Sequence, residues 1–227
     1  MRETNRERKQ EIKYNVQLDE EQKEAKRLMR EHQIVLVTGR AGSGKSLVGA
    51  QTALDYLNKK EIDQILVTRA TVEVGDSLGF LPGGVKDKLN PYLEAFVDNL
   101  NECMDPLKIK QYIEDEKIKG CTIQFIRGKT VKDILVVEEA QNITKHQMLA
   151  LLLRLGKTGK IFINGDNAQM DINPHGEVNG LSYVIELSKR FPNEIKHVKL
   201  KGNHRSDLVG MILDYEYSKT NKKEENG

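Results

Sequence analysis

The chain has 227 residues, of which 38% are hydrophobic and 31% are charged, and its formal net charge is +2. The length suits one domain with a sizeable core, and the longest apolar runs have the length of a strand, which excludes a membrane span and a secretory signal. Cys103 and Cys121 have no metal-binding spacing and cannot build a secreted disulfide scaffold, so the composition indicates a cytoplasmic protein. The mildly basic charge neither requires nor excludes a nucleic-acid partner.

Apolar runs and helical patterns alternate between two polar ends, and we expect 1–13 to form a charged N-terminal arm and 218–227 a polar, disordered C-terminal tail. Short apolar runs rich in β-branched residues predict strands, whereas apolar residues at helical spacing predict helices. The expected strands lie at 33–38, 65–68, 121–126, 134–137, 160–164 and 195–200. The expected helices lie at 18–31, 47–57, 85–104, 106–117, 144–155, 178–189 and, as a short final one, 208–213. Asp19 is expected to cap the first helix, and 79–84 is expected to be a glycine-rich loop.

Short apolar strands that alternate with helices predict an α/β fold, a mostly parallel central sheet that helices cover on both faces. Ligands of such sheets bind at the carboxyl ends of the strands. The chemically distinctive segments of this sequence all follow expected strands, so they should meet at the same edge of the sheet.

The segment 39–46 reads GRAGSGKS, which fits the pattern G-x-x-x-x-G-K-[ST] of a phosphate-binding loop. An expected strand precedes it and an expected helix follows it, which is the context that such a loop requires. Its backbone N–H groups would surround the phosphates at a helix N-terminus, with Lys45 on the β- and γ-phosphates and Ser46 on Mg²⁺. The expected nucleotide-binding residues are Gly39, Arg40, Ala41, Gly42, Ser43, Gly44, Lys45, Ser46 and Leu47. The sequence therefore predicts a site for a nucleoside triphosphate.

Two acids, Glu138 and Glu139, directly follow the apolar run 134–137. Beside a phosphate loop, the first acid after such a strand holds Mg²⁺ and the second polarises the water that attacks the γ-phosphate. We therefore assign Glu138 to the metal and Glu139 to catalysis. Asp is usual at the first position, and the extra methylene of Glu138 moves its carboxylate by about 1.5 Å. Without the phosphate loop, the two acids would fit a solvated strand end equally well.

Polar residues also follow the next two strands. Asp166 and Gln169 come after the strand at 160–164, level with the attacking water, and we assign Asp166 to the nucleotide and Gln169 to catalysis. The alternative there is an ordinary Asx turn. Arg205 follows the strand at 195–200 and is positioned to neutralise charge in the transition state, although a single arginine also fits a plain surface residue.

Taken together, these segments resemble the PhoH-like ATPases, whose core is similar to the first lobe of superfamily-one helicases. The similar segments span roughly 17–213 and are 37–46, 68–75, 78–83, 127–130, 138–142, 165–166 and Gln169. The resemblance implies a RecA-like domain at 14–217 that hydrolyses ATP with Mg²⁺. It also implies that Gln22 reads adenine, unless it is an exposed residue at a helix start. By the same resemblance, Thr68 and Arg69 contact a nucleic-acid backbone and Arg205 touches the γ-phosphate.

Two further positions are notable within the resemblance. Arg127 matches a motif position with a structural or substrate-facing role, and we assign it to nucleic-acid binding. His204 and Glu138 depart from the family, which more often has an apolar residue and an Asp there. Because about twenty residues follow Arg205, too few for a second helicase lobe, we expect a homo-oligomer, by resemblance possibly a hexameric ring, to complete the site.

Three functions fit this sequence: an ATPase that depends on single-stranded RNA or DNA, an ATP-driven switch acting on a protein partner, and a small-molecule kinase. The paired acids and the Arg205 segment favour hydrolysis over the kinase. Basic residues favour a nucleic-acid partner over the switch, and these are Arg69, Lys86, Lys88, Arg127, Lys129 and Lys132. Few aromatic residues lie among them, which argues against sequence-specific recognition.

Overall fold

The computed structural model describes residues 12, 14–70, 85–169 and 178–224, so the expected loop at 79–84 lies outside the described residues. Six strands form one sheet in the order β3-β2-β4-β5-β1-β6, and all neighbouring strands are parallel. The strands are β1 Ile34–Gly39, β2 Ile65–Arg69, β3 Ile118–Gly120, β4 Ile134–Glu138, β5 Lys160–Gly165 and β6 Ile195–Leu200. The expected parallel α/β sheet is confirmed.

Helices connect the strands, as parallel pairing requires. They are α1 Glu20–Glu31, α2 Lys45–Asn58, α3 Val85–Cys103, α4 Pro106–Glu114, α5 Ile123–Arg127, α6 Lys145–Leu152, α7 Gly180–Arg190 and α8 Asp207–Glu224, with short 3₁₀ turns η2 Ala140–Asn142 and η3 Asn167–Gln169. No helix among the described residues is long and apolar enough to cross a membrane.

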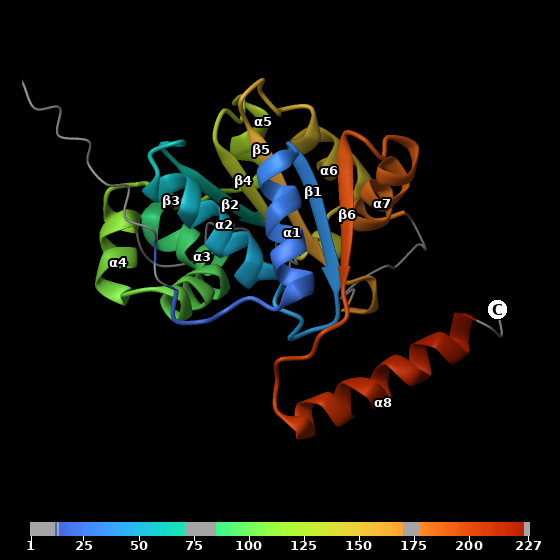
Figure 1. Cartoon of the computed structure of the whole chain (residues 1–227). Coiled ribbons are helices and arrows are strands. Elements are labelled where there is room, and N and C mark those ends of the chain that lie inside the picture. Colours follow the sequence, from blue (N-terminus) through green and yellow to red (C-terminus); the bar gives the residue numbers. More distant parts are fainter. Residues whose placement is uncertain (1–11, 13, 71–84, 170–177, 225–227) are drawn as a thin grey trace, which may run out of the picture.

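Two apolar cores cover the two faces of the sheet. Alternate residues of a strand point to opposite faces, and accordingly Val136 of β4 packs with α1–α4 whereas Leu135 packs with α5–α7. Figure 1 shows α1 crossing the near face of the sheet in front of β1 and β5. The sheet is thereby closed on both faces, and its carboxyl edge is where loops and helix starts gather.

The segment 121–126 is expected to be a strand, and the structure shows instead that it contains the start of α5. The strand in this region is the preceding β3, and Cys121 continues its pairing by donating a backbone hydrogen bond to Val67 O over 2.8 Å. The Thr122 side chain then accepts a hydrogen bond from Phe125 N and caps the helix. Ile123 and Ile126 are buried three residues apart, so the apolar residues of this segment follow the period of a helix and not that of a strand.

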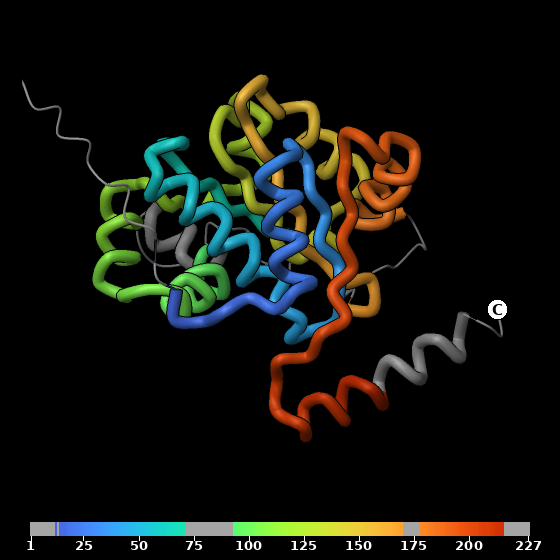
Figure 2. Tube along the Cα trace, viewed as in Figure 1, coloured from blue at the N-terminus to red at the C-terminus, as the bar shows by residue number. Residues whose placement is uncertain are grey.

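The last helix is much longer than the short helix expected at 208–213. α8 reaches Glu224 and so includes much of the tail expected to be disordered at 218–227. Figure 2 shows the chain passing from β6 beyond the start of α1 and then into the first turns of α8, which lie apart from the body of the domain. Lys201 N donates to Glu21 Oε2 over 2.7 Å at this crossing.

Candidate active site

The phosphate-loop segment joins β1 to α2, as expected, and two of its glycines have backbone conformations that other residues rarely adopt. Gly42 has φ 79° and Gly44, the residue before α2, has φ 82°. A Cβ on Gly42 would lie 2.6 Å from Arg205 Cγ, and one on Gly44 would lie 2.3 Å from Gln22 Nε2. Glycine is therefore needed for the turn and for the close approach of two side chains from distant segments.

Lys45, the first residue of α2, reaches back over the loop. Its Nζ donates to the carbonyl oxygens of Gly39 over 2.6 Å and Arg40 over 3.0 Å. Burial lowers the pKa of the Lys45 ammonium, and the nearby carboxylates of Asp166, Glu139 and Glu138 oppose this shift in pKa. These acids surround one half-buried cation, which can also attract the phosphates of a ligand.

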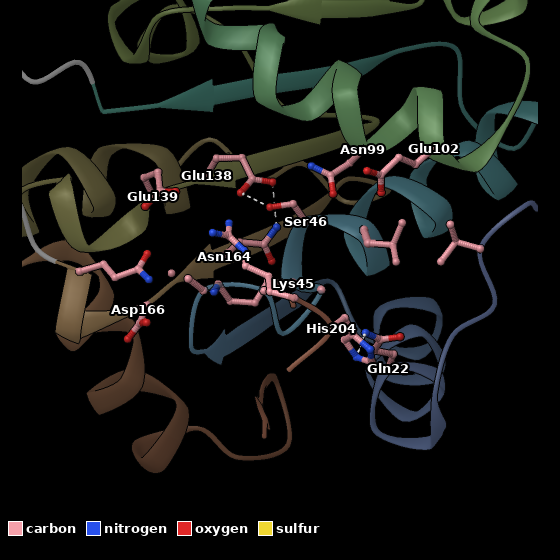
Figure 3. Close-up of a pocket in the computed structure, with 18 of the residues that line it drawn as sticks. Gln22, Lys45, Ser46, Asn99, Glu102, Glu138, Glu139, Asn164, Asp166 and His204 are labelled. Atoms are coloured by element: carbon pink, nitrogen blue, oxygen red, sulfur yellow. Dashed lines mark hydrogen bonds between the residues drawn. The ribbon is translucent and has the colours of Figure 1, made fainter. Parts of the chain in front are cut away.

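The first acid, Glu138, is held by two polar side chains. Its Oε2 accepts from Ser46 Oγ over 2.8 Å, and its Oε1 accepts from Asn164 Nδ2 over 2.9 Å. Burial raises the pKa of the Glu138 carboxyl, and the hydrogen bonds from Asn164 and Ser46 act against this rise in pKa. Figure 3 shows the three side chains grouped next to Lys45. The residues expected to bind Mg²⁺, Ser46 and Glu138, are thus in direct contact.

Asn164 has an acceptor that none of the described residues satisfies. The residue is 1% exposed and lies at the end of β5, and its Oδ1 has no hydrogen-bond partner in the part of the chain that the structure describes. A buried acceptor without a partner is costly and calls for a ligand, an ion or a water molecule. The Ser46 hydroxyl, the Glu138 carboxylate and this amide oxygen are all oxygen donors of the type that Mg²⁺ takes, so the residues fit a hydrated magnesium ion.

The second acid, Glu139, lies at the junction of β4 and η2. Its backbone is left-handed, with φ 51° and ψ 46°, which costs about 1–3 kcal/mol for a residue other than glycine. Such strain is concentrated at functional sites. Gln141 Nε2 donates to Glu139 Oε2 over 2.5 Å, so the carboxylate has a fixed neighbour.

Gln22 approaches the phosphate loop from α1. Asp19 and Gln22 form a capping box: Gln22 N donates to Asp19 Oδ1, and Asp19 N donates to Gln22 Oε1. The expected cap at Asp19 is confirmed. Gln22 Nε2 also donates to Ser43 O over 3.1 Å and lies 3.1 Å from His204 Nε2, which is 3.0 Å from Asp19 Oδ2. Gln22 is 1% exposed, so it is not an exposed residue at a helix start.

The segment after β6 folds back over the phosphate loop of the same chain. His204 N donates to Gly42 O over 3.0 Å, and the aliphatic part of Arg205 lies against Gly42. The positive charge of Arg205 also lowers the pKa of Lys45. Arg205 therefore lies at the site of its own chain. Arg40 of the loop pairs in turn with Asp214 of α8.

One cavity of about 480 Å³ brings most of the expected nucleotide residues together. The expected residues that line it are Gln22, Ala41, Gly42, Gly44, Lys45, Ser46, Leu47, Glu138, Glu139, Asp166, Gln169 and Arg205. Seven further residues line the cavity that sequence reasoning did not assign to the site, namely Val16, Gln17, Asn99, Glu102, Asn164, Gly165 and His204. Asn164 could have been found because it ends a strand beside the phosphate loop, whereas Asn99 and Glu102 of α3 belong to no motif.

The residues expected to bind nucleic acid are not gathered in one place. The Thr68 side chain is fully buried in β2, so it is not available to a polymer. Arg69 is half-buried at the carboxyl end of β2, in register with Glu138 of β4, but it is not among the residues that line the cavity. Arg127 is exposed at the end of α5, and its carbonyl oxygen accepts from Arg154 in the turn before β5, near the amino ends of the strands.

Comparison with known proteins identifies the family. The family model described as "PhoH-like protein" matches residues 16–216. This chain belongs to the PhoH-like family. A PhoH-like protein of Bacillus subtilis (strain 168) is 37% identical over 203 residues, 88% of this chain and 63% of that protein. One from Mycobacterium leprae (strain TN) is 35% identical over 190 residues, 81% of this chain and 54% of that protein.

With other relatives and with solved structures, the alignment spans only part of this PhoH-like chain and less than half of the other protein. Protein PhoH of Escherichia coli (strain K12) is 34% identical over 68% of this chain and 44% of its own length, and the chain spans about half the length of the curated relatives it matches. A Pif1 helicase from Candida albicans aligns with 83% of this chain and 40% of its own, at 16% identity and a TM-score of 0.44. The large terminase of a thermophilic bacteriophage aligns with 81% of this chain and 46% of its own, at 10% identity and a TM-score of 0.49. Both likenesses concern the arrangement of the fold alone.

Proposed function

We propose that this PhoH-like protein is a Mg²⁺-dependent ATPase whose turnover depends on single-stranded RNA or DNA. The observation that supports hydrolysis best is the contact between Ser46 of the phosphate loop and Glu138, with Lys45 and Glu139 in the same cavity. A triphosphate held by Lys45 would have a metal-binding acid and a base at its γ-phosphate end. Such an arrangement provides the parts that phosphoryl transfer to water requires.

Ser46 and Glu138 are the residues that would hold the metal, with Asn164 beside them. Mg²⁺ bound there would neutralise negative charge on the β- and γ-phosphates. Among the described residues no group of three or more His, Cys, Asp or Glu side chains gathers to hold a metal. The phosphates and water would therefore supply the other ligands, which is the usual mode for Mg²⁺.

The remaining polar groups would serve binding and proton transfer. Lys45 would exchange its hydrogen bonds with Gly39 and Arg40 for phosphate oxygens. Glu139 would orient the attacking water and accept its proton, with Asp166 and Gln169 lining the same cavity. Arg205 would approach the γ-phosphate from its place on Gly42 and reduce the developing charge.

The adenine-reading role of Gln22 forms part of the same proposal. Its amide lines the cavity beside His204, at the end away from Asp166 in Figure 3. One lone pair of Oε1 accepts from Asp19 N, which leaves the other for an exocyclic amino group. This supports a preference for ATP over GTP.

A basic and aromatic surface around α5 supports the nucleic-acid partner. The Phe125 ring is 37% exposed, and the ammonium groups of Lys129 and Lys119 lie 4.0 Å and 5.8 Å from its centre. Arg127 and Lys132 are exposed nearby in sequence. An aromatic ring among cations offers stacking and phosphate contacts to a single strand without sequence preference.

Binding measurements test this partner directly. Fluorescent single-stranded RNA and DNA are titrated with the protein at two salt concentrations, alongside Phe125→Ala, Lys129→Glu and the exposed control Lys110→Glu on α4. We expect tighter binding at low salt, and about a tenfold weaker affinity for either α5 variant but not for the control. Equal affinity of all four proteins would exclude the α5 surface.

A switch acting on a protein partner is the second candidate, and α8 favours it. Leu208, Met211, Ile212 and Tyr215 form a stripe at helical spacing, with exposed fractions of 54–68%. Arg40 of the phosphate loop pairs with Asp214 of the same helix, which links the stripe to the nucleotide site. Such a stripe could also join copies of this chain, and it is the feature that supports the proposed homo-oligomer.

A further inference from the structure

Gln141 connects the second acid of the site to the turn that follows β5. The residue belongs to η2, two positions after Glu139, and is 1% exposed. Its Nε2 donates to Glu139 Oε2 over 2.5 Å and to Gln169 O over 3.3 Å, while its Oε1 accepts from Asp166 N over 3.0 Å. One buried amide thus holds three groups that belong to or border the cavity.

The direction of this amide is fixed by its partners. A carboxylate and a carbonyl oxygen can only accept, so the NH₂ group must face Glu139 and Gln169, and the carbonyl must face the N–H of Asp166. The chain also leaves space for this amide. A Cβ on Gly165 would lie 2.9 Å from Gln141 Oε1 and 2.9 Å from Leu181 Cδ2, so glycine at the end of β5 permits the approach.

Glu138 and Glu139 have different hydrogen-bond partners, which fits different roles for the two acids. Glu138 is engaged at both oxygens, by Ser46 and Asn164. Glu139 accepts from Gln141 at Oε2, and none of the described residues donates to its Oε1, which is the oxygen we assign to the water molecule. The left-handed backbone of Glu139 sets the direction in which its side chain leaves the chain. The hydrogen bond from Gln141 to Oε2 then fixes the carboxylate, and with it the position of Oε1.

We propose that Gln141 is the positioning residue of this site: it aims Glu139 at the attacking water and couples it to the turn carrying Asp166 and Gln169. The inference rests on the proposed ATP hydrolysis and adds the residue that orders its base. Gln141 is not among the described residues that line the cavity, so it would act on the reaction only through its neighbours. A shift of the turn, which borders the cavity, is transmitted through one side chain to the carboxylate.

The test compares Gln141→Glu with a matched control. Glutamate keeps the size and the acceptor for Asp166 N but removes both donors, and it places a like charge against Glu139. Gln147→Glu makes the same change in the capping box of α6, where a glutamate also functions. We measure kcat and KM for ATP, the affinity for a fluorescent ATP analogue, and the melting temperature, with Glu139→Gln as the inactive reference.

The expected result is a 10- to 100-fold lower kcat for Gln141→Glu, with analogue affinity within about twofold of the parent, because misplacement of a catalytic group by about 1 Å has an effect of this order. Gln147→Glu should keep the parent kcat. The double variant Glu139→Gln with Gln141→Glu restores a donor and an acceptor to the pair, so it should recover the melting temperature that Gln141→Glu loses while remaining inactive.

Each other outcome is decisive. If the parent hydrolyses ATP, Glu139→Gln does not, and Gln141→Glu keeps its kcat, the positioning role is wrong and the ATPase stands. If Gln141→Glu loses kcat and analogue affinity to the same extent, Gln141 supports the fold of the cavity and does not position the base. If the parent is inactive, or Glu139→Gln remains active, the proposed function fails and this inference fails with it.

Discussion

Ser46 Oγ and Glu138 Oε2 are joined by a hydrogen bond of 2.8 Å across 92 positions of the sequence. The bond links the start of α2 to the end of β4, and thus the phosphate loop to the first acid. Its existence depends on the sheet order, which places β4 two strands from β1, with Asn164 of the intervening β5 between them. Residues from three separate parts of the chain are therefore needed to build one corner of the site.

Lys45→Ala is expected to weaken ATP binding by about 100-fold or more, because it removes the cation that would contact the β- and γ-phosphates. A loss of about this order is typical of a charge-assisted contact to phosphate. Lys23→Ala is the control, since Lys23 is exposed and pairs only at the surface with Glu20. Titration with a fluorescent ATP analogue measures both. Unchanged affinity in Lys45→Ala would remove the basis for the phosphate site.

Glu138→Gln is expected to raise the magnesium concentration for half-maximal hydrolysis by about tenfold or more, since a neutral amide is a poorer ligand. Glu139→Gln should instead bind ATP and magnesium normally and lose turnover. Hydrolysis assays over a magnesium series separate the two. If Glu138→Gln abolishes turnover at saturating magnesium and Glu139→Gln does not, the two acids exchange roles.

The raised pKa of Glu138 has a consequence for stability without metal or nucleotide. The Glu138 carboxyl binds a proton more tightly in the folded chain than in the unfolded chain. The protonated carboxyl therefore stabilises the fold fully at a pH below the ordinary pKa of 4.5, and this contribution is lost as the pH rises through the raised pKa. Glu138→Gln, which keeps partners for Ser46 and Asn164, should therefore melt higher than the parent at about pH 7 and equally at a pH below the ordinary pKa of the carboxyl. Melting curves over pH in the presence of a chelator measure this, and an equal difference at every pH would contradict it.

Gly44→Ala is expected to lower the free energy of unfolding by at least about 1–2 kcal/mol, because Gly44 is left-handed and a Cβ there would meet Gln22 Nε2 at 2.3 Å. Gly49→Ala is the matched control within α2. Its Cβ would lie at an ordinary 3.4 Å from Asn164 Nδ2, so helix propensity should leave stability equal or slightly higher. Urea unfolding compares the two variants, and an equal loss in both would contradict this account of the loop.

The exposed apolar stripe on α8 predicts that copies of this chain associate through this helix, while the fold of the sheet does not depend on that contact. Replacing Met211 and Ile212 with Glu should leave the melting temperature unchanged, because both side chains are mostly exposed, and should convert an oligomer into a monomer. Light scattering at several protein concentrations measures the mass. A parent that is monomeric at all of them, with and without ATP, would exclude self-association through this helix.

The phosphate loop and the two acids could be predicted from the sequence because each is a short contiguous pattern that follows a strand. The contacts that complete the site could not. Asn164 donates a hydrogen bond to Glu138, 26 positions away in the sequence, and Gln141 accepts one from Asp166 N, 25 positions away. The roles of Asn164 and Gln141 therefore depend on which strands become neighbours in the sheet. The burial of Thr68, by contrast, follows from its place in an expected strand of a sheet that helices cover on both faces, and it conflicts with the expected contact to nucleic acid.

The central claim is an ATPase that depends on single-stranded nucleic acid. It is tested most directly by steady-state ATP hydrolysis with and without single-stranded RNA and DNA, at fixed low salt, with Glu139→Gln as the control. We predict a low basal rate, a clear stimulation by at least one polymer, and no turnover by the variant under any condition. A rate that neither polymer changes would contradict nucleic-acid dependence and favour the switch acting on a protein partner, and turnover by Glu139→Gln would contradict the assignment of the base.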